Sequence, residues 1–90
     1  MNLSDTVTIP TQVMARQVGD ETVILDLASG TYFGLDSMGT RIWQLIGQGQ
    51  TLAEICTILL AEYDVSAEEL ERDLLRLVQE LDAQGLIHRA

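Results

Sequence analysis

The side chains of this sequence that could take part in catalysis or bind a metal are one cysteine, one histidine and a group of carboxylates. A single thiol, Cys56, cannot form an internal disulfide, and with one histidine it cannot supply the several ligands that a zinc site needs. Cys56 falls on the apolar stripe of a predicted helix, where a thiol is an inert core residue. His88 lies close to the C-terminal end, where chains tend to fray. We therefore expect no catalytic residue, no metal and no other cofactor.

The carboxylates gather on the last predicted helix and have a simpler explanation than catalysis. Glu68 and Glu69 fall in its first turn, where negative charge complements the helix dipole. Helical spacing also allows pairing with Arg72 and Arg76 along a solvated face. The glycines at 30, 34 and 39 do not fit a dinucleotide or P-loop motif. These patterns favour a binding module over an enzyme.

The overall charge excludes several classes of partner. The 90 residues hold 14 acidic residues against five arginines and no lysine, a formal net charge of −9. Such a surface repels nucleic-acid phosphates and anionic lipid. The N-terminal segment lacks the basic and apolar regions of a signal peptide, and no apolar run approaches the ~20 residues that span a bilayer. We expect a cytoplasmic protein that binds neither nucleic acid nor membrane.

The first third of the chain predicts a small antiparallel sheet. Residues 1–11 are polar and β-branched, and we interpret them as a mobile or loosely packed N-terminal arm. Residues 12–18 and 21–27 flank Gly19-Asp20, a two-residue turn that closes hairpins. In the second of these strands Val23, Leu25 and Leu27 share one face. Thr31–Leu35 follows as a third short strand, so the order predicts a three-stranded meander.

The remainder has the helical period. Asp36 or Ser37 caps a first helix that ends near Ile46. The spacing of Thr51 and Glu54 predicts a capping box for a second helix, and Ser66–Glu69 predicts another for a third helix that reaches Ala83. The fold class is therefore α+β: a winged helix-turn-helix-like domain over residues 12–90, with a three-stranded N-terminal sheet followed by three helices.

Two features of this arrangement favour peptide binding. Pro10 and Arg16 disfavour the pairing of another strand with the first strand, whereas the third strand has neither proline nor charge. An open strand edge of this kind can accept an extended peptide. The third helix carries an apolar surface wider than one stripe, formed by Leu74, Leu75, Leu77 and Val78. The alternatives are that the third strand only faces the core, and that the helix is packed on two sides.

These residues resemble the PqqD-like family of leader-peptide recognition domains, which serve ribosomally synthesised and post-translationally modified peptides. The resemblance covers roughly residues 13–87. It rests on VILDLASGTYFGL, on the GTRIW of the first helix, and on DLLRLVQEL followed by GLI, in that order and spacing.

The resemblance implies a binding mode and a set of site residues. Family members bind the leader as an added strand beside the third strand, in the cleft against the third helix. The backbone of Thr31, Tyr32, Phe33, Gly34 and Leu35 would then pair with the leader. Tyr32, Leu70, Asp73, Leu74 and Leu77 would line or border the side-chain pockets, with Asp73 at the family's acidic position.

The turn Ala28-Ser29-Gly30 and the entry to the first helix look most like the free-standing recognition proteins of lasso-peptide pathways. That resemblance implies a non-catalytic adaptor that presents the precursor to a separate leader protease or another maturation enzyme, as a monomer or weak dimer. Three alternatives stay open: a peptide chaperone of pyrroloquinoline quinone biosynthesis, a winged-helix DNA-binding regulator, and a module that dimerises through the third-strand edge.

Overall fold

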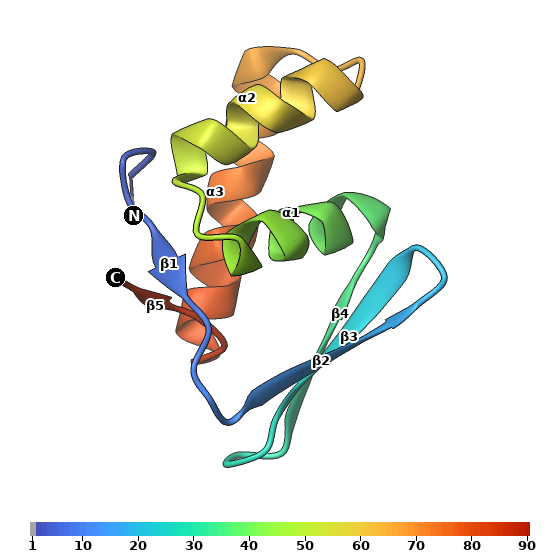
Figure 1. The fold of residues 1–90 in the computed structure, drawn as a ribbon, viewed down its shortest axis with the longest axis vertical. Coiled ribbons are helices and arrows are strands. Elements are labelled where there is room, and N and C mark those ends of the chain that lie inside the picture. The colour runs from blue at the N-terminus through green and yellow to red at the C-terminus, as the bar shows by residue number, and fades with distance from the viewer. Residues whose placement is uncertain (1) are drawn as a thin grey trace.

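The computed structural model describes residues 2–90 and has three helices packed beside two small sheets (Figure 1). The elements run β1 (Val7–Thr8), β2 (Val13–Val18), β3 (Glu21–Asp26), β4 (Thr31–Leu35), α1 (Ser37–Gly47), α2 (Leu52–Glu62), α3 (Ala67–Ala83) and β5 (His88–Arg89). Strands β2, β3 and β4 form an antiparallel sheet in that order. The predicted α+β class is confirmed, including a third strand with the predicted bounds.

The three helices begin where their capping residues place them. Asp36 caps α1 by accepting a hydrogen bond from the Gly39 N–H at 2.8 Å. Thr51 and Glu54 form the complete predicted capping box of α2. Ser66 caps α3 by accepting from the Glu69 N–H, while the return bond from the Glu69 side chain is not formed. Each cap satisfies a first-turn N–H that the helix itself cannot pair.

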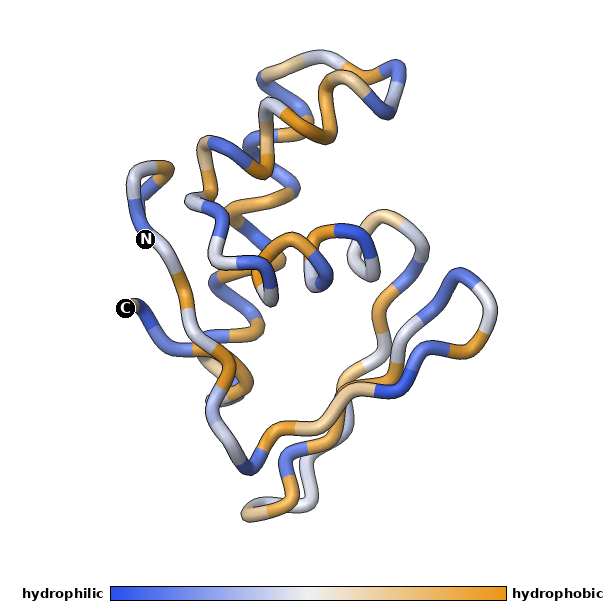
Figure 2. Tube along the Cα trace, in the orientation of Figure 1, coloured by the Kyte–Doolittle hydropathy of each residue, from blue (hydrophilic) through white to orange (hydrophobic). Residues whose placement is uncertain are grey.

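The core lies where the helices meet one another and the inner face of the sheet. Figure 2 shows hydrophobic residues recurring between hydrophilic ones along each helix, the pattern of amphipathic helices. Leu45, Leu59, Leu74 and Leu81 are buried, one or two from each helix. The helical period of α2 predicts that Leu60 faces the core together with Leu52, Ile55, Cys56 and Leu59, but Leu60 is exposed.

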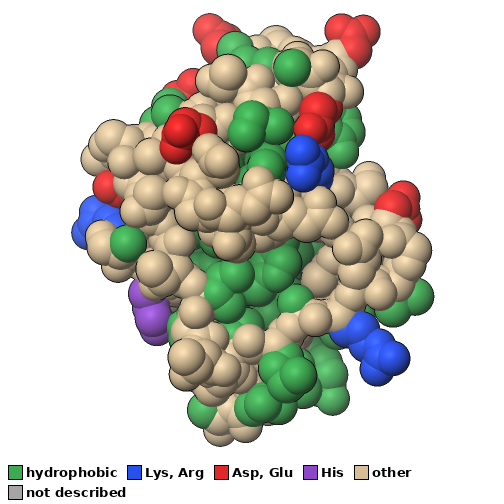
Figure 3. Space-filling model, viewed as in Figure 1, with side chains coloured by type: hydrophobic (Ala, Val, Ile, Leu, Met, Phe, Trp, Pro, Cys, Tyr) green, Lys and Arg blue, Asp and Glu red, His purple; other side chains and the backbone are tan. Residues whose placement is uncertain are grey.

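Strand β3 buries the face opposite to its most apolar residues. Ile24 is buried with Thr22 and Asp26, whereas Val23 and Leu27 on the other face are exposed. The two buried polar side chains have partners: the hydroxyls of Thr22 and Thr40 are 2.9 Å apart, and Asp26 accepts from the Ala28 N–H. Because these groups are satisfied, their burial carries little penalty. Hydrophobic side chains consequently reach the surface over the three-stranded sheet (Figure 3).

The N-terminal segment is packed, contrary to the interpretation of a mobile or loosely packed arm. β1 pairs with β5, and Val7 is buried. The carbonyls of Leu3 and Asp5 accept hydrogen bonds from the first two N–H groups of α2, at 2.7 and 3.0 Å. The arm therefore completes the capping of α2 and ties the two ends of the chain together. Met1 lies outside the described residues.

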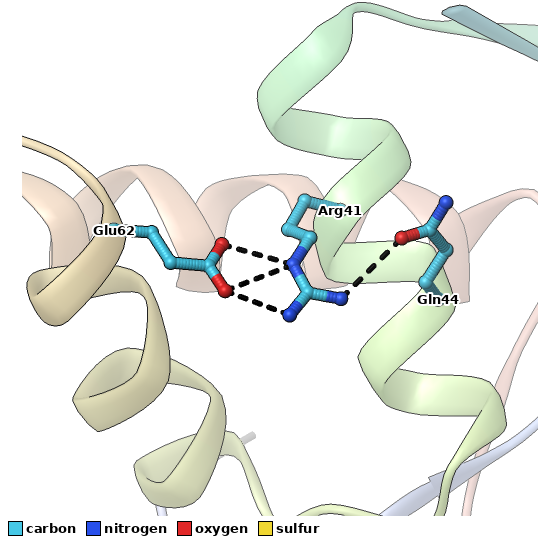
Figure 4. A network of polar contacts seen from close by, with 3 residues as sticks. All are labelled: Arg41, Gln44 and Glu62. Carbon is cyan, nitrogen blue, oxygen red and sulfur yellow. Dashed lines mark hydrogen bonds and ion pairs between the residues drawn. The ribbon is translucent and has the colours of Figure 1, made fainter. Parts of the chain in front are cut away.

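A surface ion pair joins α1 to α2 (Figure 4). The guanidinium of Arg41 donates to both carboxylate oxygens of Glu62, with a shortest distance of 2.7 Å, and also to Gln44. The hydrogen bond from Arg41 lowers the pKa of Glu62 below its usual value, and the same bond raises the pKa of Arg41. This contact adds a polar link between α1 and α2 at the surface.

Candidate functional site

Strand β4 has one strand neighbour, β3, within the part of the chain that the structure describes. The β1–β5 pair forms a separate sheet and does not cover β4. The free edge of β4 therefore presents backbone N–H and C=O groups without a strand partner. An extended segment could add to this edge as a fourth strand.

The two faces of β4 would guide such a segment differently. The register pairs Phe33 with Ile24 on the inner face, and Tyr32 with Leu25 on the outer face. Phe33 packs against the core, while Tyr32 is 71% exposed. Because side chains alternate along a strand, every second side chain of an added strand would point toward the helices and the others would lie beside Tyr32.

A pocket of about 280 Å³ begins where β4 ends. Asp36 follows the last residue of β4 and caps α1, so the start of α1 forms one wall, with Met38, Gly39 and Ile42. The facing wall is α3, and Val65 closes the end. The α3 residues that line it are Glu69, Leu70, Asp73, Leu74, Arg76, Leu77 and Glu80. This volume lies below the range of drug-sized ligand pockets and suits one peptide side chain.

The structure brings together four of the nine predicted site residues in this pocket. Leu70, Asp73, Leu74 and Leu77 all line this pocket. Leu70 and Leu74 are buried and form its floor, whereas Leu77 is half-buried at its side. None of Thr31–Leu35 lines the pocket. Tyr32 in particular points to the outer face, so the structure separates it from the pocket that it was expected to line or border.

The charged groups around the pocket are arranged differently from the expected pairing. Arg76 makes an ion pair with Asp73 at 2.9 Å, three residues before it, instead of with Glu69. Asp36 is occupied by its cap bond to Gly39. The residues that line the pocket carry carboxylates, one guanidinium and apolar groups, but no thiol, hydroxyl or imidazole. Such a lining can bind and orient a peptide.

Cys56 and His88 lie away from this pocket. Cys56 is buried in α2, and its burial, with a smaller effect of Glu71, raises the pKa of the thiol. His88 lies in β5, whose residues do not line the pocket. Among residues 2–90 no group of three His, Cys, Asp or Glu side chains could hold a metal ion. Nor does any helix there have the length and apolar character to cross a bilayer.

Sequence reasoning missed the α1 wall of the site. Met38 and Ile42 lie in the predicted first helix, and Glu69 and Glu80 are among the carboxylates of the predicted last helix, but none of the four was assigned to the site. The available signal was chain adjacency. A helix that starts directly after an edge strand begins close to that edge. Its first turn can therefore contact a peptide that binds along the strand.

Comparison with known proteins identifies relatives with this arrangement. Among curated sequences, none matches this chain. The TbiB1 protein, solved in complex with the TbiA(beta) leader peptide, is 40% identical, with a TM-score of 0.84 over 88% of this chain and 92% of that one. A lasso peptide synthetase B1, solved with its leader peptide, is 28% identical, with a TM-score of 0.82 over 90% and 95%.

The family comparison covers most of the domain. Residues 21–87 match the model of the coenzyme PQQ synthesis protein D family, PqqD. The match includes β3, β4, the three helices and all residues that line the pocket. The resemblance drawn from the strand, helix and turn motifs is thus confirmed, and the chain belongs to the PqqD family.

Proposed function

We propose that this protein is a non-catalytic adaptor that binds the leader of a ribosomally synthesised precursor peptide. The leader adds as a strand to the free edge of β4 and places one side chain in the pocket between α1 and α3. The adaptor then presents the precursor to a separate maturation enzyme, and a leader protease of a lasso-peptide pathway is the partner that we favour.

The observation that carries this proposal is the junction of an open edge with an apolar pocket. Main-chain hydrogen bonds along β4 would supply affinity for any extended peptide, while the pocket would select among side chains. Both solved relatives were captured with leader peptides. This supports the same class of ligand here.

The alternatives have weaker support. The family description favours the quinone-pathway chaperone, but both solved relatives are leader complexes, and the second is a lasso peptide synthetase component. DNA binding is opposed by the net charge of −9, because duplex binding needs cations that face phosphates. Self-pairing through β4 would use the edge that the leader needs, so we propose a monomer or weak dimer in the free state.

The test is selection of peptides followed by mapping of the bound edge. Random 16-residue peptides displayed on phage would be selected on the immobilised protein, and amide hydrogen exchange would be measured with and without a selected peptide. We expect protection of β4 amides to rise at least about tenfold, with no change along β2. N-methylation of the alternate peptide amides that face β4 should abolish binding, because it removes the donors that an added strand uses.

Two results would overturn the proposal. One is a selection that recovers no peptide above background. The other is a bound peptide that leaves the exchange of Thr31–Leu35 unchanged, which would place the ligand elsewhere.

A further inference from the structure

The pocket beside β4 is strongly acidic at its rim. Its lining contains four carboxylates and one guanidinium, a formal charge of −3. Arg76 is already paired with Asp73, and Asp36 is engaged as the cap of α1. Among the described residues, the carboxylates of Glu69 and Glu80 make no ion pair. These two exposed acids are therefore available to a ligand.

Glu69 and Glu80 stand at opposite ends of the pocket on one face of α3. Their separation of eleven residues equals almost a whole number of turns, so both lie on the same side of the helix, about 16 Å apart along its axis. Leu70 and Leu74, the apolar floor, fall between them along the axis but on the adjoining face of α3, while the paired Asp73 and Arg76 share the side of the two acids. An extended chain advances about 3.3 Å per residue, so roughly five peptide residues span the distance.

We infer that the leader recognised by this protein is a cationic segment, with an apolar anchor flanked by lysine or arginine residues about five positions apart. The inference rests on the proposed function and adds the charge of the ligand to it. The anchor enters the pocket, and the flanking cations reach Glu69 and Glu80. The net charge of −9 adds a long-range attraction for such a peptide and repels acidic ones.

The test uses the peptides selected above, three variants of the full chain and one control variant. Glu69→Gln and Glu80→Gln remove one charge each while keeping the shape of the side chain, and the double variant removes both. Glu71→Gln is the matched control: it lies on the same helix, is exposed, and does not line this pocket. Circular dichroism confirms that each variant is folded.

We expect the selected peptides to be enriched in lysine and arginine on both sides of an apolar residue. The double variant should weaken binding about fivefold, the size expected for two solvent-exposed ion pairs. Glu71→Gln should change it less than about twofold. Raising NaCl from 50 to 500 mM should weaken binding to the wild type more than to the double variant, because salt screens exposed charges.

The failure of this inference is distinct from failure of the proposed function. Selected peptides that protect β4 but show no basic enrichment, together with unchanged affinity in the double variant, would overturn the inference and leave peptide binding intact. An equal loss in Glu71→Gln would also overturn it, since the effect would then come from overall charge. Recovery of no peptide would reject the proposed function itself.

Discussion

Within residues 2–90 the three-stranded sheet has two edges without a strand partner, β2 and β4, and they differ in what lies beside them. β2 is exposed from Met14 to Val18 and carries the charged Arg16. β4 runs directly into the cap of α1, and the pocket opens at that point. Both edges offer backbone hydrogen bonds, but of the two it is β4 that adjoins this pocket, whose side chains we propose select the ligand. An open strand becomes a specific site through its neighbours.

The β1–β5 pair contrasts with both edges, because each of these strands pairs with another strand of the same chain. β1 and β5 pair with each other across the length of the chain. Asp5 and Arg89 add an ion pair at 3.6 Å, and the Ala90 N–H donates to the carbonyl of Thr6. Backbone hydrogen bonds thus join the two terminal strands, while the equivalent groups at the edge of β4 have no strand partner among the described residues.

The largest expected effect comes from charging the pocket beside one edge but not the other. Leu77→Asp should weaken binding of a selected peptide by about 2 kcal/mol, roughly 30-fold, because a carboxylate would be desolvated against the anchor. Val18→Asp on β2, where the side chain is 66% exposed, should change affinity less than about twofold. Isothermal titration of both variants measures the difference.

The peptide titration has a clear contrary outcome. Equal losses in the two variants would mean that β2 and β4 are equivalent as binding edges. Leu77→Ala serves as a milder version if the aspartate variant is poorly folded. Leu74 is unsuitable for this test because it is fully buried in the core, so a charge there would unfold the domain.

The next effect concerns the closed strand pair. Val7→Ala should lower the free energy of unfolding by about 1.5 kcal/mol, since the Val7 side chain of the arm is buried against the core. Val18→Ala on the exposed β2 should cost less than about 0.5 kcal/mol. Urea denaturation measures both, and peptide affinity of the folded proteins should stay unchanged. A Val7 variant that is as stable as wild type would show that the arm contributes little.

The smallest expected effect is a pH dependence of the stability, which comes from the Arg41–Glu62 ion pair between α1 and α2. Arg41 holds the pKa of Glu62 below the usual 4.5, so this ion pair stabilises the fold fully above that value and is lost as pH falls further. From pH 5 to pH 3 the urea midpoint of wild type should therefore fall more than that of Glu62→Gln. Glu71→Gln is the control and should follow the wild type. Parallel slopes for all three proteins would contradict the role of this pair.

Periodicity and capping motifs were sufficient to predict the main elements. The alternation around Gly19-Asp20 gave the hairpin, and Thr51 with Glu54 marked the start of α2, because both signals are local. The β1–β5 pair was not predictable in this way. Two-residue strands have no measurable period, and their pairing joins residues about eighty positions apart.

The site was predicted in part for the same reason. Leu70, Leu74 and Leu77 follow the helical period of α3, and the resemblance to the PqqD-like family grouped them as site residues. The outward direction of Tyr32 depends on which face of β3 is buried. That choice was decided by Thr22 and Asp26, two polar residues that find hydrogen-bond partners in the fold. Hydropathy alone would favour burial of the face that carries Val23, Leu25 and Leu27. The pattern of apolar residues therefore predicts the wrong buried face for β3.

The pairing of β1 with β5 has a practical consequence for protein engineering. The amino and carboxyl ends leave the molecule as neighbours, and neither β1 nor β5 contributes a residue to the pocket. The domain can therefore be inserted into a surface loop of a host protein, because the two points of connection lie close together. A peptide-capture module could be transplanted in this way with its groove left accessible.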